Sequence, residues 1–533
     1  TNISFGRQPD GNDGWMFFDQ PTPNNSNVTI GYQGIQDEKP FFSLSGGFYN
    51  NSIKLFLSSD SGSIYYTTDG SKPTAVSNIF LDSINLDSTS IIRASVIKPN
   101  YISKDVVSHT YFINESFDSR GLPVFSISTS PDYFWGEDTG LYVQDFKPTW
   151  EHPINIEFYE QDGSLGFNEL AKIKIVGDLN WQLPQKMLSI SLDDDINYPL
   201  LSGFIRKKYN SFNLRNSGSD WSSTLFRDGL GQELSNRHMD IDIQGFRPSI
   251  VFVNGVYMGI HNIRQKLNDN YIEESYNISS DEFDVIENNG MVVNGDDIEF
   301  NELYYILENS DFSIKSEYDN IKTIINVDNY IDFVISEVYV ANSSWAHNIV
   351  CWKPKGITNA KWKWMLTDLD RGLILGSVHK DYLIRLAEDN NSWSTLAFRK
   401  LLESEEFTDL FISKLSDYLY ITFHSLKVQD QIHLFKDKIK DEVPYHVEKW
   451  KNDTSSYGDG ISSFAFWESE TQKMITFAEK RDSYVRGDMI AMFDLEEAVT
   501  LTVSLSDDES GKVRLNNLFV PAPYWEGKYV KKI

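Results

Sequence analysis

The run WKWMLTDLDRG at residues 362–372 decides how the centre of this chain is interpreted. Its first half is rich in aromatic and apolar residues and is typical of a buried strand. Asp368 and Asp370 follow that strand, two residues apart. Two carboxylates at the end of a strand can reach one magnesium ion if the backbone turns there, because magnesium prefers hard oxygen ligands. A DxD pair alone is a weak signal, so the surrounding elements decide its meaning.

A helix and a hairpin precede these aspartates. Apolar residues recur at helical spacing over residues 329–340, and strand-like runs at 348–353 and 361–365 form the hairpin. Together with the strand-like runs further upstream, these elements predict a mixed α+β domain. The loop at 341–348 lies between the helix and the hairpin.

Asn348 makes that loop chemically interesting. Protein kinases place a catalytic Asp and a metal-binding Asn five residues apart on such a loop, with a metal-binding Asp further along the chain. Asn348 precedes Asp368 across the hairpin, so the order is the expected one. Five residues before Asn348, however, the chain has Ser343 instead of Asp.

Lys186 is the third candidate, within the run WQLPQKMLSI at residues 181–190. A lysine between apolar neighbours on a strand is well placed to meet a phosphate inside a cleft. A surface lysine that covers apolar neighbours with its alkyl chain is an equally good interpretation.

The composition excludes several classes of partner. Acidic residues outnumber basic residues by 77 to 48, which gives a formal net charge of −29. This charge opposes binding to nucleic acids and adsorption to anionic membranes. No apolar run approaches the roughly 20 residues that span a bilayer, so we expect neither a nucleic-acid partner nor a membrane span. The chain starts without Met, as a trimmed or mature fragment would, so the lack of a visible signal peptide says little about location.

Cys351 is the only cysteine, which excludes an intrachain disulfide and a thiolate zinc cluster. The run around it, residues 349–352, is typical of a buried strand. We interpret Cys351 as a small hydrophobic residue rather than a nucleophile.

Length and patterning predict several domains. At 533 residues the chain exceeds what one hydrophobic core usually organises. Short alternating runs and the turn DGSKP at 69–73 predict a small antiparallel sandwich. After residue 381, helical spacing predicts helices over 394–404, 406–423, 426–445 and 469–486. The expected divisions are a strand remnant and loop at 1–27, a β-sandwich at 28–114, an α+β domain at 115–490 with a β-rich part at 115–265 and a mostly helical part at 266–490, and a short β addition at 491–533.

Five motifs in the central block resemble those of the spore-coat CotH kinase-like family. They occur in the family's order over about residues 122–376: PQKML at 184–188, LRN at 214–216, FRDGL at 226–230, VNGVYMGIHNIR at 253–264 and WKWMLTDLDRG at 362–372. The resemblance implies an atypical protein-kinase fold that uses ATP and a divalent metal, Mg²⁺ or Mn²⁺.

The resemblance also implies roles for single residues. Lys186 would contact the phosphates, Asn348 and Asp368 would bind metal, and Asp370 would support both the metal and the reaction.

For Arg227 and Asp228 the resemblance implies an ion pair that organises the nucleotide cleft. The alternative interpretation, an ordinary pair on a helix surface, has equal weight.

Two departures from the family pattern put catalysis in doubt. The catalytic-loop Asp is replaced by Ser343, or by Ser344 if the Trp that follows is aligned instead. The Glu that the family shows after the 253–264 run is Gln265. A serine cannot accept the proton of a substrate hydroxyl near neutral pH as an Asp would. His347, in the same loop, is the alternative base.

The N-terminal region resembles two further families. The run GSIYYTTDGSKPT at 62–74 is similar to the signature of chitobiase C-terminal-type domains, which are fibronectin-like accessory sandwiches found beside carbohydrate-active or surface modules. Such a sandwich would contact glycan or serve as a spacer. The runs GRQPDG and PTP within residues 1–27 resemble the closing segment of a lamin-tail β-domain. This combination of domains predicts an extracellular or cell-surface protein.

Two functions from different classes follow from the sequence. The first is a secreted or surface CotH-like kinase domain that binds ATP and a divalent metal, with weak or absent transfer to Ser or Thr of a surface protein. The second is a catalytically inactive, pseudokinase-like scaffold or adhesive protein that binds glycan or protein partners. Carbohydrate hydrolysis is disfavoured, since no pair of catalytic carboxylates is recognisable.

Overall fold

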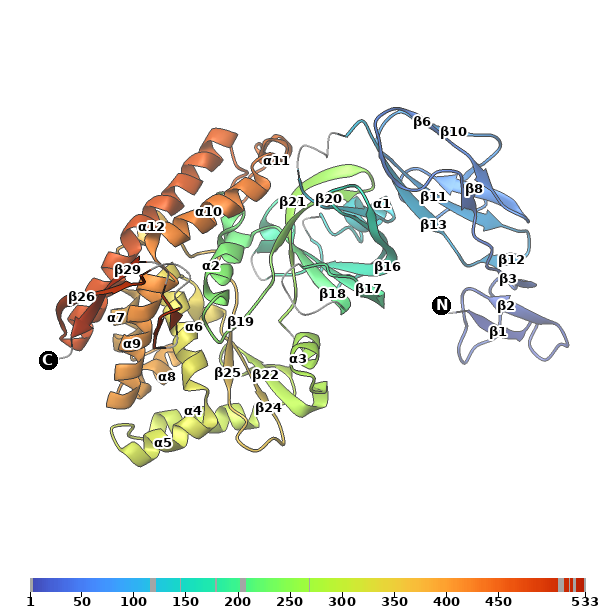
Figure 1. Ribbon diagram of the computed structural model, residues 1–533. Coiled ribbons are helices and arrows are strands. Elements are labelled where there is room, and N and C mark those ends of the chain that lie inside the picture. The colour runs from blue at the N-terminus through green and yellow to red at the C-terminus, as the bar shows by residue number, and fades with distance from the viewer. Residues whose placement is uncertain are drawn as a thin grey trace.

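The computed structural model describes residues 3–115, 121–143, 145–177, 180–201, 208–267, 269–506, 512–516, 518–520 and 524–531. A β-rich N-terminal region, a central barrel and a largely helical region follow one another along the chain (Figure 1). This arrangement confirms the fold class expected from the sequence, a small all-β unit followed by an α+β domain with a helical C-terminal part.

A five-stranded sheet forms the larger layer of the N-terminal sandwich, in the order β5-β13-β11-β8-β9. All its pairings are antiparallel except that of β5 with β13, which is parallel. The predicted antiparallel sandwich therefore contains one parallel pairing at its edge. β5 and β13 are far apart in the sequence, so no hairpin dictates their direction. The strands are β5 (Gly47–Tyr49), β8 (Ser63–Thr67), β9 (Asn78–Ile79), β11 (Ser90–Ile97) and β13 (Val107–Ile113).

The core of the sandwich lies between this sheet and short paired strands. Ile92, Ala94 and Val96 alternate along β11 and are all fully buried, as expected for residues that share one face of a strand. They pack in one cluster with residues such as Leu55 and Leu57 from the second layer. That layer consists of β4 (Phe41–Phe42) paired with β7 (Leu57–Ser58), and β6 (Ile53–Leu55) paired with β10 (Ile84–Leu86).

Two small sheets lie before and beside the sandwich. The hairpin of β1 (Ser4–Arg7) and β2 (Trp15–Phe18) comes first, and β3 (Gly34–Gln36) pairs in parallel with β12 (Tyr101–Ser103).

Seven strands close into a barrel in the order β14-β15-β16-β17-β18-β21-β20. The predicted hairpin at Asn254-Gly255 is confirmed: both residues have positive φ, 49° and 76°, as a type I′ turn requires. Closure depends on the parallel pairing of β14 with β20, two strands distant in sequence that no local pattern connects. The strands are β14 (Val124–Ser128), β15 (His152–Tyr159), β16 (Leu165–Ile175), β17 (Leu188–Asn197), β18 (Lys208–Arg215), β20 (Arg247–Val253) and β21 (Val256–Arg264).

The sandwich and the barrel are joined by a buried junction. Thr110 Oγ1 of β13 donates to Glu157 Oε2 of β15 at 2.5 Å, and Tyr159 Oη donates to Glu157 Oε1 at 2.8 Å. The ring of Tyr159 also lies 5.4 Å from Phe48 and 5.8 Å from Phe112, both in the sandwich. Polar and aromatic contacts therefore connect the two units directly.

A second sheet lies beyond the barrel, in the order β19-β25-β24-β22-β23. The hairpin predicted at 348–353 and 361–365 is confirmed as β24 (Val350–Pro354) and β25 (Lys363–Leu366), and Cys351 is buried in β24. Helix α6 packs against β25, since the Asn329 side chain accepts from Trp364 N and donates to Trp364 O. The remaining bounds are β19 (Asp242–Ile243), β22 (Phe283–Glu287), β23 (Met291–Asn294) and α6 (Val327–Val340).

The helical region differs from the sequence prediction at one clear break. One helix was expected over 426–445, but α10 ends at Ile439 and α11 begins at Val443. Pro444 lies in the first turn of α11, where its missing N–H costs nothing, whereas inside a continuous helix it would remove a hydrogen bond. The helices are α1 (Pro131–Trp135), α2 (Arg227–Asn236), α3 (Asp269–Tyr276), α4 (Ile298–Asn309), α5 (Lys315–Ile324), α7 (Tyr382–Glu388), α8 (Trp393–Leu401), α9 (Glu405–Ile421), α10 (Ser425–Ile439), α11 (Val443–Trp450) and α12 (Phe464–Phe493).

The chain ends in short strands, of which β26 (Glu496–Ser504) and β29 (Tyr524–Lys531) pair antiparallel. Tyr529 Oη donates to Asp417 Oδ1 of α9 at 2.6 Å, so this addition packs on the helical region. Across the described ranges, no helix combines the length and the apolar character that crossing a membrane requires.

Candidate functional site

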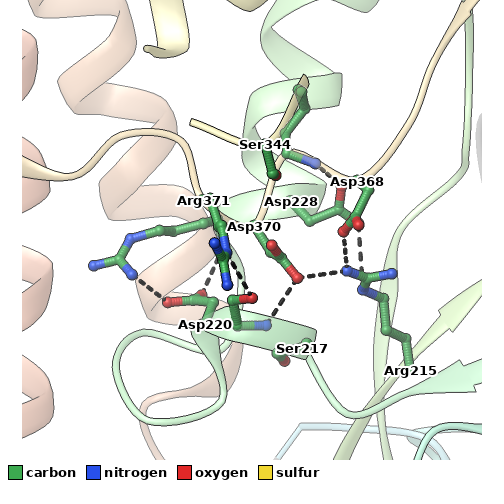
Figure 2. Close-up of polar contacts among 12 residues, drawn as sticks. Arg215, Ser217, Asp220, Asp228, Ser344, Asp368, Asp370 and Arg371 are labelled. Carbon is green, nitrogen blue, oxygen red and sulfur yellow. Dashed lines mark hydrogen bonds and ion pairs between the residues drawn. The ribbon is translucent and has the colours of Figure 1, made fainter. Parts of the chain in front are cut away.

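Asp368 and Asp370 follow the end of β25 and converge on one partner, Arg215 at the end of β18. Asp368 has a φ of 52°, a left-handed conformation that Asp tolerates better than bulky residues do. Arg215 Nη2 donates to Asp368 Oδ1 at 2.5 Å and to Asp370 Oδ2 at 2.7 Å (Figure 2). The backbone turn therefore brings both carboxylates to one cation, which joins the barrel to the second sheet.

Arg215 is the electrostatic centre of this site. Its side chain is 10% exposed. Burial alone would lower the pKa of the guanidinium, but the carboxylates of Asp368, Asp228 and Asp370 raise it above its ordinary value. Arg215 therefore remains charged and binds the aspartates together. Arg215 belongs to the LRN run at 214–216, which resembles a family motif, but the sequence predicted no role for it.

Asp228 extends this network from the first turn of α2. Its Oδ2 lies 2.9 Å from Arg264 Nη2, and its Oδ1 accepts from Leu369 N at 2.9 Å. Burial raises the pKa of this carboxyl, but the charges of Arg264 and Arg215 together outweigh that effect. The pKa of Asp228 therefore lies below its ordinary value. Asp228 is thus ionised, and it fixes the backbone between the two aspartates of the DLD run.

The expected ion pair between Arg227 and Asp228 is wrong. Arg227 Nη1 instead lies 2.9 Å from Asp220 Oδ1, while Asp228 faces the arginines of the barrel. Adjacent residues on a helix project in different directions, so they do not face each other. Asp220 also accepts from Phe226 N at 2.8 Å and from Arg227 N at 2.9 Å, and thereby satisfies the first N–H groups of α2. Arg227 stabilises the start of the helix rather than the cleft.

Asp370 is held in place from two sides. Its side chain is 3% exposed, and its Oδ2 accepts from Arg215 Nη2 and, at 2.8 Å, from Ser219 N. Burial and the nearby Asp368 raise the pKa of Asp370 well above its ordinary value, against the influence of Arg215. Asp370 therefore positions Arg215, and it has little freedom to serve as a separate ligand or base.

The loop after α6 lies beside the DLD turn. Asn342 Nδ2 donates to Asp368 O at 3.3 Å, and Asn342 Oδ1 accepts from Ser344 N at 3.2 Å and from Ser344 Oγ at 3.1 Å. Ser343 is exposed, whereas Ser344 lies next to Asp368 and Asp370 (Figure 2). Of the two serines considered for the catalytic position, Ser344 is the one that this loop brings to the site. Asn342, which is 1% exposed, was not anticipated from the sequence.

A cavity of about 360 Å³ opens beside Asp368. It is bounded by the barrel, the second sheet and the loop after α6, so residues from three separate stretches of the chain meet there. Asn213 Oδ1 and Asn288 Oδ1 are buried acceptors in its wall that have no hydrogen-bond partner among the described residues. The lining includes Asn213, Arg215, Lys266, Asn288, His347, Asn348 and Asp368. His347, Asn348 and Asp368 are therefore brought together, as the sequence predicted.

Lys186 is not part of this cavity, so its predicted place beside the aspartates is wrong. It lines a different cavity next to Tyr142 and Trp450, and its Nζ donates at 2.7 Å to two carbonyls, Trp181 O and Leu183 O. Burial lowers the pKa of Lys186 to about 8. Lys186 lies close to the end of β18 in the barrel, since Leu188 pairs with Leu214, but its side chain lines the cavity beside α11. Arg215 and Lys266 supply the cations beside Asp368 instead.

The donors beside Asp368 suit a metal that arrives with phosphates rather than alone. Among the described residues, no group of three or more His, Cys, Asp or Glu side chains could hold a metal ion. Asp368 is 31% exposed and Asn348 shares its cavity, so they offer one carboxylate and one amide oxygen. Magnesium is commonly held by one or two carboxylates plus substrate phosphates. The residues present therefore fit a metal–nucleotide complex, for which Mn²⁺ would use the same oxygen donors.

Glu337 lies beneath the site and was missed by sequence reasoning. It is 2% exposed on α6, and both carboxyl oxygens are buried. Burial raises the pKa of Glu337 to about 8, with smaller contributions from Asp368 and Asp228, while Asn342 opposes the shift. Near neutral pH this carboxyl is mostly protonated, so it adds little negative charge beneath the aspartates.

A β-rich lobe and a helical lobe that meet at a paired-aspartate turn define a kinase-like domain. Comparison with protein families agrees: the family described as CotH kinase protein matches residues 173–485. This match covers more than half of the chain, and the chain belongs to the CotH kinase family. Residues 44–108 match the chitobiase/beta-hexosaminidase C-terminal domain. A search of curated proteins finds no match.

Proposed function

We propose that this chain is a CotH-family kinase domain that binds ATP with Mg²⁺ or Mn²⁺ in the cavity beside Asp368. The observation that carries the proposal is the convergence of Asp368 and Asp370 on Arg215, at the wall of a cavity that also contains Asn348. In a chain with a net charge of −29, a buried arginine paired with Asp228, Asp368 and Asp370 is a specific local arrangement.

The residues of the cavity divide the binding task. Asp368 and Asn348 would hold the metal, whose charge would neutralise that of the phosphates and favour transfer of the terminal phosphoryl group. Arg215 and Lys266 place positive charge in the same cavity. The buried acceptor Asn213 Oδ1 is available to a donor of the ligand, because a buried oxygen without a partner gains free energy when a donor reaches it.

The weaker part of the site is its base. Ser344 occupies the loop position beside the aspartates, and its hydroxyl is bonded to Asn342. Asp370 is engaged by Arg215 and Ser219 N. His347 shares the cavity with Asp368, so it is the side chain that would accept the proton of a Ser or Thr hydroxyl. Phosphoryl transfer to a surface protein would therefore be slow.

The same observations support a second candidate function, a pseudokinase-like scaffold. This function is supported because both candidate positions for the catalytic Asp are serines, Ser343 and Ser344. The ion pairs of Arg215 with Asp368 and Asp370 are nevertheless present. Such a domain would bind nucleotide without transferring a phosphoryl group, or would serve as a folded scaffold alone. Its partner-binding surface would lie outside the cavity beside Asp368. The chitobiase-type segment supports placement outside the cell and contact with glycan by the sandwich.

Isothermal titration calorimetry with ATP, with and without Mg²⁺, tests the leading proposal. We expect magnesium-dependent binding that is lost in Asp368→Ala. Asp381→Ala is the matched control, because Asp381 is a surface aspartate that pairs at 2.9 Å with the exposed Arg385. Binding that persists in Asp368→Ala would place the nucleotide elsewhere. Absence of binding at about 10 mM ATP would leave the scaffold as the function.

A further inference from the structure

Another cavity, which shares no lining residue with the cavity beside Asp368, gathers basic side chains in the helical region. It opens at the C-terminal end of α2, against the end of α9 and the first turns of α10, and has a volume of about 280 Å³. Its wall includes Arg237, His238 and Lys427. A water molecule needs roughly 10–15 Å³ of such space, so this cavity has room for a polyatomic ligand. We refer to it below as the α2–α10 cavity.

The three basic groups act on one another. Burial lowers the pKa of Lys427, and the nearby Arg237 lowers it further. Burial also lowers the pKa of His238, with further contributions from Lys427 and Arg237. These shifts mean that the groups repel each other across the cavity. An anion that enters would relieve this repulsion and so bind with a favourable electrostatic free energy.

The basic cluster lacks an acidic partner among the residues that the structure describes. Within the described ranges, no carboxylate oxygen lies within 4.0 Å of a side-chain nitrogen of Arg237, His238 or Lys427. Asp430 is the acidic residue in the wall, and it is exposed on the rim. Acidic residues outnumber basic ones by 77 to 48 in this chain, so two adjacent cations and a histidine without a paired carboxylate are unusual for it.

Contacts with the end of α9 explain part of this arrangement. Lys427 Nζ donates to Ile421 O at 2.8 Å, and His238 Nδ1 lies 3.0 Å from Thr422 Oγ1. A lysine at a helix C-terminus is a common stabilising feature. These contacts use one of the three Lys427 hydrogens and one of the two His238 ring nitrogens. The other donors, together with the exposed guanidinium of Arg237, remain for a ligand in the cavity.

We propose that the α2–α10 cavity is an oxyanion site that takes a phosphate group, supplied by free phosphate or by a phosphorylated side chain. A phosphate group carries close to two negative charges at neutral pH and several strong acceptor oxygens, which matches donors that converge from two stretches of chain, the end of α2 and the start of α10. A carboxylate offers one charge and two oxygens, so it would satisfy the cluster less well. This inference does not depend on nucleotide binding beside Asp368.

Titration of the full chain with inorganic phosphate at constant ionic strength tests the proposal. Arg237→Gln and Lys427→Gln each remove one charge, and each should weaken binding at least tenfold, because a charge-assisted hydrogen bond contributes on this scale. Lys440→Gln is the matched control, since Lys440 follows α10 and pairs on the surface with Asp437 at 3.0 Å. Arg237 is exposed, so Arg237→Gln should fold normally even if Lys427→Gln does not.

Asp368→Ala distinguishes this site from the nucleotide cavity. Phosphate binding that survives in Asp368→Ala but is weakened in Arg237→Gln and Lys427→Gln would support the proposal. Equal binding by wild type and both glutamine variants would overturn it. No binding of phosphate or of a phosphoserine peptide at about 10 mM would also overturn it.

The two sources of the phosphate group are separated by the ligand used. A phosphoserine peptide that binds at least tenfold more tightly than inorganic phosphate, while its unphosphorylated form does not bind, identifies a phosphorylated side chain. Similar affinities for the peptide and for the ion identify a site for free phosphate.

Discussion

Arg481 on α12 provides the sharpest test of how the helical region supports the site. It is fully buried, and it donates to four carbonyls: Val338 O at 2.6 Å, Tyr339 O at 3.0 Å, Val378 O at 2.7 Å and Lys380 O at 3.0 Å. Two of these carbonyls end α6, directly before the loop that carries Asn342 and Ser344. The other two follow the DLD turn. One side chain therefore joins the backbones on both sides of the candidate site.

Arg481→Met keeps an unbranched side chain but removes all four donated bonds. At about 1 kcal/mol for each carbonyl left without a partner, the loss is about 4 kcal/mol. Burial lowers the pKa of Arg481 to about 10, so the guanidinium is still charged near neutral pH, and its removal relieves some of that burial cost. For a domain of this size, the unfolding midpoint should fall by about 5 °C.

Differential scanning fluorimetry with Arg385→Met as control measures this effect. Arg385 is 61% exposed and pairs with Asp381 one helical turn away, so its loss should change stability by less than about 0.5 kcal/mol. A midpoint for Arg481→Met within about 1 °C of that of Arg385→Met would refute the reasoning. If Arg481→Met does not fold, Arg481→Lys keeps the charge with fewer donors, and its midpoint should fall by a smaller amount.

Two further predictions concern the candidate site. Glu337 has its pKa raised from an ordinary value of 4.5 to about 8, so its contribution to stability is fully present below about pH 4.5 and is lost as the pH rises through 8. The wild type should therefore lose about 3 kcal/mol relative to Glu337→Gln between about pH 5.5 and 8.5, and parallel denaturation curves at both pH values would contradict the raised pKa. Ser344→Asp restores a carboxylate beside Asp368 and should raise phosphoryl transfer from radiolabelled ATP to Ser or Thr peptides by about 10²-fold or more. Ser343→Asp, on an exposed residue of the same loop, is its control, and equal rates in the two variants would refute the assignment of Ser344 to the catalytic position.

Local patterns predicted those parts of the fold that short stretches of chain decide by themselves. Asn254-Gly255 predicted a hairpin because its two residues tolerate the positive φ that a tight turn needs. The apolar spacing over 329–340 predicted α6, and the aromatic run ending at Leu366 predicted β25. Pro444 carried the signal for the break between α10 and α11, but the helical spacing on either side concealed it.

Contacts between distant stretches were beyond the reach of these patterns. The barrel closes through the pairing of β14 with β20, and the sequence of neither strand indicates which strand it pairs with. Arg215 and Lys186 are both cations beside strands of one barrel, and their sequence surroundings look equally suited to a phosphate. The two residues lie near each other on neighbouring strands, and only the tertiary structure directs Arg215 to Asp368 and Lys186 to the cavity beside α11.

The sequence by itself determined the family and the order of β-rich and helical regions, and it predicted Asp368, Asp370 and Asn348 as site residues. These follow from residue types at short spacings, which adjacent backbone geometry translates directly into structure. The tertiary structure alone decided which cation meets the aspartates, that Asp228 faces Arg264 rather than Arg227, and that Glu337 is buried beneath the loop. The physical reason is that ion pairing and burial depend on how separate elements pack. A single stretch of sequence does not show which other stretch it will contact.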